Sequence, residues 1–205
     1  MYLNVLNKNQ TEMLSFIKLF KRKYYLVGGT AIALHIGHRE SIDFDLFTLG
    51  KVDKKKILEA IESLKYKSLK IFEGHDQYHA VVNDVKCTFF QYPYNIPHII
   101  SVENHITIPS LLDLAAMKAL AMAQRSKWKD YVDLYFIIKN HYSIKEISEQ
   151  AYKYFEGQFS EKLFRGQLQY FTNINYSEQI DYLIPNPPSE QEVKDFLTEK
   201  ALDIF

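Results

Sequence analysis

Two aspartates separated by one residue, Asp43 and Asp45, are the strongest candidates for chemistry in this sequence. They belong to residues 41–47, where apolar and polar residues alternate as they do in a β-strand. Residues two apart on a strand point to the same side of the sheet, so the two carboxylates are expected to project together. Adjacent carboxylates repel each other unless a cation lies between them, and Mg²⁺ takes oxygen ligands and carries phosphates. We therefore predict a magnesium site at this pair; the alternative is a solvated strand face that carries two acids by chance.

A turn with two glycines precedes this strand. Residues 24–27 predict a short buried strand that runs through Gly28 and Gly29 into a helix starting at Thr30. Glycine lets the backbone approach a ligand closely, and the N–H groups at the start of a helix suit a phosphate. Thr30 adds a hydroxyl donor. Such turns are mostly structural when they occur alone, but next to an acid pair this one predicts a triphosphate site.

These two motifs together resemble a known superfamily. Gly28-Gly29-Thr30, followed by Arg39-Glu40-Ser41-Ile42-Asp43-Phe44-Asp45, resembles the signature of the polymerase-β-type nucleotidyltransferases. More narrowly, the pattern is similar to that of the AbiEii/AbiGii toxin-like nucleotidyltransferases. The resemblance implies that Asp43 and Asp45 bind Mg²⁺ and act in catalysis. It also implies nucleotide binding by five residues, namely Gly28, Gly29, Thr30, Arg39 and Ser41. From the residues alone, pairing of Arg39 with a phosphate and pairing with an acid are equal alternatives.

The resemblance continues into the second half of the chain, where one lysine, Lys118, interrupts an apolar helix. The family carries such a lysine ahead of an Arg/Lys-Asp-x-x-Asp-Leu motif, which matches residues 129–134. On an unbroken helix Asp133 would return to within about 60° of Lys118 and Asp130 to within about 120°, which favours Asp133 as the partner of Lys118. The family implies that Lys118 binds nucleotide phosphate and that Asp133 orients it or acts as a base. Asp130 is expected to be a structural ion-pair or capping residue, although the reverse assignment stays open.

One part of the superfamily pattern is missing. Many of these enzymes carry a third carboxylate on a later strand, and residues 85–90 are its natural place. The position facing the metal would be Thr88, or Lys86 in another register, and neither is an acid. The alternatives are that Asp133 replaces the third acid, that one metal suffices, or that the site is degenerate.

The order of the expected elements predicts an α+β protein. A small mixed-sheet nucleotidyltransferase core is expected over residues 1–105, followed by a helical region over residues 106–205 that completes the active site. Strands are expected at 24–27, 41–47, 68–72, 78–82, 85–91 and 106–108, and helices at 9–20, 30–36, 53–64, 110–123, 129–139, 143–155, 160–171 and from Ser189 onward.

Composition excludes several classes of protein. The 25 basic and 25 acidic residues cancel, which argues against a general nucleic-acid-coating protein. The single cysteine, Cys87, permits neither a disulfide within the chain nor a cysteine-based zinc site. No secretory signal and no membrane span is evident, so a cytoplasmic protein without a membrane partner is expected. The 15 Tyr and 14 Phe residues are scattered, and we expect them to pack in the core rather than to stack on bases.

The leading functional hypothesis is an Mg²⁺-dependent nucleotidyltransferase. It would move a nucleoside monophosphate from an NTP to a hydroxyl of tRNA or another RNA, a protein or a small molecule. The family resemblance implies the toxin of a toxin–antitoxin or abortive-infection pair, with an antitoxin partner and a role in phage defence. The alternative is a catalytically degenerate nucleotide- or partner-binding module on the same fold.

Overall fold

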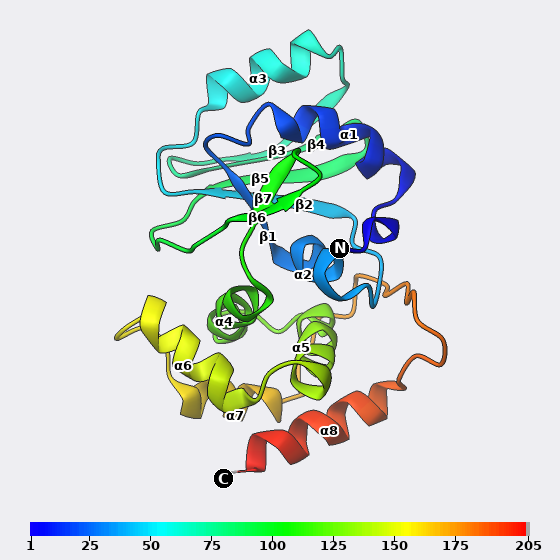
Figure 1. The fold of residues 1–205 in the computed structure, drawn as a ribbon, viewed down its shortest axis with the longest axis vertical. Coiled ribbons are helices and arrows are strands. Elements are labelled where there is room, and N and C mark those ends of the chain that lie inside the picture. The colour runs from blue at the N-terminus through cyan, green and yellow to red at the C-terminus, as the bar shows by residue number, and fades with distance from the viewer. Residues whose placement is uncertain (204–205) are drawn as a thin grey trace. The chain divides into compact units, whose positions relative to one another are not determined.

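The computed structural model describes residues 1–203. They form two compact units, Met1–Ser110 and the residues from Leu111 onward. Figure 1 shows that the first unit contains the strands together with three α-helices, and that the second unit is helical. The chain is therefore an α+β protein, as the sequence predicts.

The first unit is built on one mixed sheet of five strands. These are β1 (Tyr25–Val27), β2 (Asp43–Thr48), β3 (Ser68–Glu73), β4 (Gln77–Val82) and β5 (Val85–Gln91). They are arranged in the order β1-β2-β5-β4-β3, in which only the β2–β5 pair is parallel. Two further short strands, β6 (Ile100–Val102) and β7 (Ile106–Ile108), form a separate antiparallel ribbon.

The helices of the first unit begin and end at residues with clear local reasons. They are the 3₁₀ turn η1 (Leu3–Val5) and the helices α1 (Lys8–Lys18), α2 (Gly28–Ile36) and α3 (Lys54–Ser63). A reciprocal capping box between Asn7 and Gln10 opens α1, and the Asp53 side chain accepts from the Lys56 N–H at the start of α3. Gly37 ends α2 in the left-handed conformation, with φ at +69°.

The two faces of the sheet differ in burial: one is packed in the core, and the other leaves polar side chains partly exposed. One face carries apolar side chains that are fully or almost fully buried, including Phe44, Leu46, Cys87 and Phe89. Helices α1 and α3 lie on one side of the sheet in Figure 1, and Phe20, which follows α1, makes a ring contact with Phe89 at 5.1 Å. The opposite face, which we call the open face, carries half-buried side chains: Asp43, Asp45, Phe47, Gln77, His79, Val81, Lys86, Thr88 and Phe90.

The second unit consists of helices. These are α4 (Leu111–Met122), α5 (Trp128–Asn140), α6 (Ile144–Tyr154), α7 (Glu161–Leu168) and α8 (Glu190–Leu202). Ser143 and Glu146 form a complete capping box at the start of α6. At the start of α8 the Ser189 side chain accepts from the Glu192 N–H, while the Glu192 carboxylate binds Tyr135 and Lys139. Glu192 thereby ties α8 to α5.

The expected elements exist, and most of their ends differ by one to three residues from the structure. Asn83 and Asp84, a residue pair typical of tight hairpin turns, form the turn between β4 and β5, both with positive φ. Strand β6 was not expected, because Ile100–Val102 follows a proline-rich stretch and is only three residues long. The alternation of residues 41–47 would place Ile42 on the buried side of the strand with Phe44 and Leu46, but Ile42 precedes β2 and is exposed.

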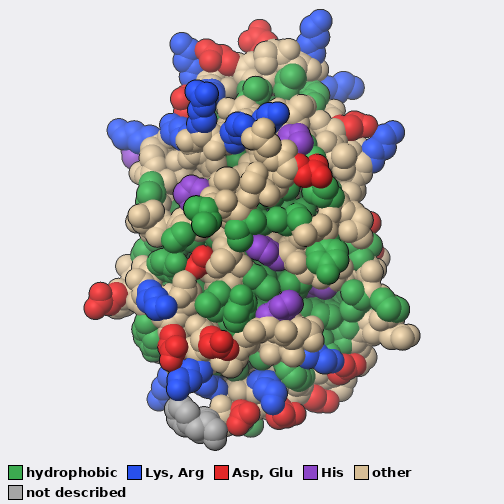
Figure 2. All heavy atoms as spheres, in the orientation of Figure 1, with side chains coloured by type: hydrophobic (Ala, Val, Ile, Leu, Met, Phe, Trp, Pro, Cys, Tyr) green, Lys and Arg blue, Asp and Glu red, His purple; other side chains and the backbone are tan. Residues whose placement is uncertain are grey.

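None of the helices within residues 1–203 is long and apolar enough to cross a membrane. In Figure 2, basic and acidic side chains lie next to one another where charged residues gather on the visible face. The formal net charge of the chain is zero.

Candidate active site

The acid pair lies on β2 at the edge of the open face. Asp43 and Asp45 alternate with Phe44 and Leu46, both of which are fully buried. The two carboxylates therefore project to the same side of the sheet, and the side chain of Asp43 is 29% exposed. This is the arrangement that the spacing predicts, and it leaves the carboxylates accessible to a ligand.

The glycine turn approaches the acid pair so closely that no side chain fits between them. Val27 pairs with Asp45 across β1 and β2, which places Gly28 beside the Asp45 carboxylate. A Cβ on Gly28 would overlap Asp45 Oδ2, and the φ of Gly28 is +73°, a conformation that L side chains rarely adopt. A Cβ on Gly29 would lie 2.6 Å from Arg39 Nη2 and 3.3 Å from Ser41 Oγ. Glycine is therefore required at Gly28, whereas a side chain at Gly29 would have to displace the end of the Arg39 side chain.

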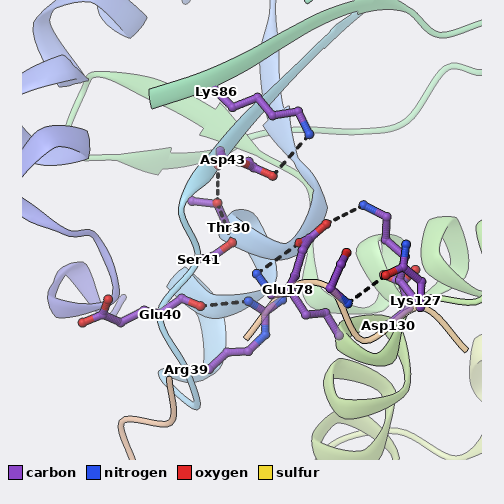
Figure 3. Close-up of polar contacts among 12 residues, drawn as sticks. Thr30, Arg39, Glu40, Ser41, Asp43, Lys86, Lys127, Asp130 and Glu178 are labelled. Carbon is purple, nitrogen blue, oxygen red and sulfur yellow. Dashed lines mark hydrogen bonds and ion pairs between the residues drawn. The ribbon is translucent and has the colours of Figure 1, made fainter. Parts of the chain in front are cut away.

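Thr30 and Ser41 link the helix start to the acid strand. Their hydroxyl oxygens are hydrogen-bonded at 2.9 Å, and Thr30 Oγ1 also donates to the main-chain carbonyl of Asp43 (Figure 3). Both residues are buried. The hydroxyl proton of Thr30 is thus used within the protein, so Thr30 fixes the position of Asp43 rather than facing outward.

Arg39 is buried although it carries a charge. Its side chain is 1% exposed, and Nη1 donates to the main-chain carbonyl of Glu40 at 2.8 Å (Figure 3). Nη2 lies over Gly29, at the N-terminus of α2, where no side chain caps the helix. A guanidinium beside a helix N-terminus concentrates donors and positive potential at one point, which suits a phosphate.

Strand β5 shows what occupies the place of a third acid. Asp43 is in register with Lys86, and Asp45 with Thr88, so both candidates for the third position lie on the open face next to the acid pair. Lys86 Nζ lies 3.8 Å from Asp43 Oδ2 (Figure 3). The residues of β5 that face the acid pair are therefore the basic Lys86 and the neutral Thr88, and neither supplies a third carboxylate. The contact between Lys86 and Asp43 was not foreseen from the sequence, because it depends on the pairing of two distant strands.

The carboxylates of Asp43 and Asp45 fit a magnesium ion. The described residues contain no group of three His, Cys, Asp or Glu side chains that could enclose a metal. Two carboxylates without further protein ligands suit Mg²⁺, which keeps several waters and binds substrate phosphates.

The second unit holds a buried ion-pair cluster around Lys118. Lys118 Nζ lies 2.6 Å from Asp130 Oδ1 and 2.9 Å from Asp133 Oδ2, and the three side chains are at most 6% exposed. Burial on its own would lower the pKa of Lys118, but the two carboxylates outweigh it and raise that pKa. Lys118 is thus held as an ammonium, and among the described residues two of its three N–H donors are used.

The structure pairs Lys118 with Asp133, as the spacing favours, and also with Asp130, which the spacing did not favour. The spacing argument assumed an unbroken helix, but α4 ends at Met122 and α5 begins at Trp128. The turn between them brings both Asp130 and Asp133 to Lys118. Asp130 is also bound by Arg125 Nε at 3.2 Å, in agreement with its expected role as an ion-pair residue.

Comparison with solved structures defines the class of this fold. MenT4, a nucleotidyltransferase toxin from Mycobacterium tuberculosis H37Rv, matches with a TM-score of 0.63 and 12% identity over 94% of this chain and 81% of that one. JHP933 from Helicobacter pylori matches with a TM-score of 0.56 and 14% identity over 96% and 91% of the two chains. The fold is therefore that of the nucleotidyltransferase toxins.

Comparison of sequences gives the family. The model of the family described as "Nucleotidyl transferase AbiEii toxin, Type IV TA system" matches residues 17–103 and 79–202. The chain belongs to this AbiEii family, as its motifs suggest. An uncharacterized protein of Aquifex aeolicus (strain VF5) is 34% identical over an alignment of 135 residues, and the match covers 63% of this chain and 65% of that relative. The match thus spans slightly less than two thirds of the relative's length.

Proposed function

We propose that this protein is an Mg²⁺-dependent nucleotidyltransferase that transfers a nucleoside monophosphate from an NTP to an acceptor hydroxyl. The observation that carries the proposal is the position of the Asp43 and Asp45 carboxylates beside the Gly28-Gly29 turn. A triphosphate needs an acid-bound cation and backbone donors within reach of each other, and the two carboxylates beside the start of α2 would supply the ligands of such a cation and the donors.

Each residue of the proposed site has a separate task. Asp43 and Asp45 would hold Mg²⁺, which when bound neutralises phosphate charge and activates the phosphorus for attack. The N–H groups at Gly28 and Gly29 and the Arg39 guanidinium would bind the triphosphate. Thr30 and Ser41 would fix the acid strand against the start of α2 through their hydroxyl hydrogen bonds.

The reaction itself is a substitution at phosphorus. The acceptor oxygen forms a bond to the α-phosphorus, the bond to the β-phosphate breaks, pyrophosphate leaves, and the hydroxyl proton is released. Positioning and charge neutralisation would supply most of the rate acceleration.

Lys118 and Asp133 are proposed as catalytic residues of the second unit, on the basis of the family motif. Lys118 would bind nucleotide phosphate through its remaining N–H donor. Asp133 has a side chain that is 0% exposed and bound to Lys118, which favours an orienting role over that of a base. Asp130 would share this orienting role, since its contact with Lys118 is as short.

We further propose the biological setting that the family suggests. The protein would be the toxin of a toxin–antitoxin pair that acts in the cytoplasm in phage defence, with an antitoxin protein as its partner. Candidate acceptors are tRNA or another RNA, a protein hydroxyl and a small molecule.

The test of this function is transfer of labelled nucleotide. Incubation with each α-³²P-labelled NTP, Mg²⁺, total cell RNA and protein should place label on one macromolecule. Asp45→Asn removes one carboxylate charge with little change in shape, and it should abolish transfer while the protein stays folded. Unchanged transfer by this variant would contradict the assignment.

A second candidate function is a nucleotide-binding module without catalysis. The observation that favours it is Lys86, whose ammonium approaches Asp43 from the strand where many enzymes of the superfamily carry a third acid. This module would bind an NTP without consuming it. An equilibrium binding assay combined with the transfer assay separates the two candidates.

A further inference from the structure

Aromatic side chains gather at one end of the open face, next to the acid pair. We call them the aromatic cluster; its members are Tyr25, Phe47, Phe90, Tyr92, Tyr94 and His98. The ring centroid of Phe47 lies 5.2 Å from the ring centroid of Phe90 and 5.0 Å from that of Tyr92. Tyr92 continues the chain of contacts to Tyr94 at 5.1 Å. Tyr25 stacks on His98 with a centroid distance of 4.2 Å and an interplanar angle of 16°.

The cluster continues the same surface that carries the carboxylates. Phe47 is two residues after Asp45 on β2 and therefore projects to the same side, about 7 Å further along the strand. Phe90 follows Thr88 on β5 in the same way and is in register with Phe47. A ligand whose phosphates lie at Asp45 would thus bring its nucleoside part within reach of these rings.

The burial of the cluster differs from that of a packed core. On the opposite face of the same strands, Phe44 and Phe89 are 0% exposed. Phe47, Phe90, Tyr92 and Tyr94 are only half-buried, so part of each ring surface is accessible.

A buried hydroxyl inside the cluster points to a polar ligand. Tyr25 is 2% exposed, yet its hydroxyl has no hydrogen-bond partner among the described residues. A buried hydroxyl without a partner is costly, and groups of this kind are normally satisfied by protein, water or ligand. Burial raises the pKa of Tyr25 and is the main cause of the raised pKa of Tyr92, to which the charges of Tyr25 and Tyr94 add.

We propose that the aromatic cluster binds a nucleobase, with Phe47 and Phe90 as stacking surfaces and the Tyr25 hydroxyl as a hydrogen-bonding group. Stacking on aromatic side chains tolerates any base, and the tyrosine hydroxyl can donate to a ring nitrogen or carbonyl of the base. The base belongs either to the NTP or to an RNA acceptor, which present the same chemistry. This inference rests on the proposed function for the identity of the substrates, and its first test does not require transfer.

The first test measures binding alone. The protein is labelled with 4-fluorophenylalanine, and the ¹⁹F signals of Phe47, Phe90 and Phe72 are assigned from the variants Phe47→Leu, Phe90→Leu and Phe72→Leu. Addition of the four ribonucleoside 5′-monophosphates should shift the Phe47 and Phe90 signals, while ribose 5-phosphate should not. The signal of Phe72, which lies outside the cluster on the edge strand β3, should stay in place. Absence of a shift at Phe47 and Phe90, or an equal shift with ribose 5-phosphate, would overturn the proposal.

The second test identifies the source of the base. Phe47→Leu keeps an apolar side chain but removes the ring, and it should raise one KM about 5- to 150-fold. A higher KM for the NTP assigns the cluster to the incoming nucleotide, and a higher KM for RNA assigns it to the acceptor. Phe72→Leu is the matched control and should leave the KM for the NTP and the KM for RNA unchanged. If both KM values of a folded Phe47→Leu variant equal those of the wild type, the cluster does not bind a base.

A further variant guards against misfolding. Phe90→Leu removes the other proposed stacking ring, and it should show the same change in KM if Phe47→Leu is unstable by circular dichroism. If the ¹⁹F shifts occur but no transfer is found with any NTP, the proposed function fails while nucleobase binding stands.

Discussion

The carboxylate of Asp45 lies directly against Gly28, at the point where a side chain on that glycine would begin. This relationship joins the turn that would bind phosphate to the strand that would bind the metal, and it follows from the pairing of Val27 with Asp45 across β1 and β2. The two motifs of the sequence are therefore one structural element.

Replacement of Gly28 tests this relationship. Gly28→Ala places a Cβ where Asp45 Oδ2 lies and forces an L residue to a φ of +73°, which costs about 1–2 kcal/mol. We expect a lower free energy of unfolding in urea and a loss of nucleotide transfer larger than the loss of folded protein explains. Gly166→Ala is the matched control, since Gly166 lies in α7 with no atom within 4 Å of its added Cβ. It should be neutral or slightly stabilising, and an equal effect of both variants would refute the argument.

Removal of the Lys118 charge should destabilise the second unit. Lys118→Ala leaves the buried carboxylates of Asp130 and Asp133 without their shared cation, and such losses cost about 3–5 kcal/mol. Urea denaturation measures this difference. Lys139→Ala removes a pair whose side chains are 44% and 53% exposed, and it should change stability by less than about 1 kcal/mol. If Lys118→Ala is as stable as the wild type, the cluster is not held together by this charge.

The ion pairs of Glu178 predict that the free energy of unfolding depends on pH in the acid range. Burial alone would raise the pKa of Glu178, but hydrogen bonds from Lys127 and Lys129 outweigh it and lower the pKa from 4.5 to about 2. Because the folded pKa is depressed, the stabilisation is present above pH 4.5 and is lost as the pH falls towards 2.

The experiment compares Glu178→Gln with the wild type by urea denaturation over this pH range. The wild type should be more stable at pH 7, and the difference should shrink between pH 4.5 and 2. Glu199→Gln, which removes a carboxylate that is 71% exposed, should show a much smaller difference at neutral pH. A difference for Glu178→Gln that stays constant down to pH 2 would contradict the assignment.

Mg²⁺ and a nucleotide should stabilise the folded protein together. A ligand present at 100 times its Kd raises the free energy of unfolding by about 2.7 kcal/mol, so an NTP analogue with a non-cleavable α,β bond should raise Tm when Mg²⁺ is present. Chelation of the metal by EDTA should remove most of this increase. An equal rise in Tm with and without metal would show that Asp43 and Asp45 do not bind nucleotide through Mg²⁺.

Local patterns made much of the first unit predictable. The alternation around Asp43 and Asp45 gave the strand and its polar side, and Asn83-Asp84 marked the turn between β4 and β5 because both residues tolerate positive φ. These features depend only on neighbouring residues.

Features that depend on distant contacts were not predictable. Lys86 meets Asp43 only because β5 pairs in parallel with β2. The break between α4 and α5 brings Asp130 to Lys118, whereas spacing on one helix pointed to Asp133 alone. The scattered Tyr and Phe residues gave no sign that five of them gather with His98 at one end of the open face.

The most direct test of the central claim compares two aspartates that differ in position. Asp43→Asn removes a carboxylate of the proposed metal site, whereas Asp84→Asn changes an exposed turn residue with positive φ, where asparagine is well tolerated. With α-³²P-labelled NTP, Mg²⁺ and cell RNA and protein, we predict that the wild type and Asp84→Asn transfer label to the same acceptor and that folded Asp43→Asn transfers none. Transfer by Asp43→Asn at the wild-type rate would contradict the account.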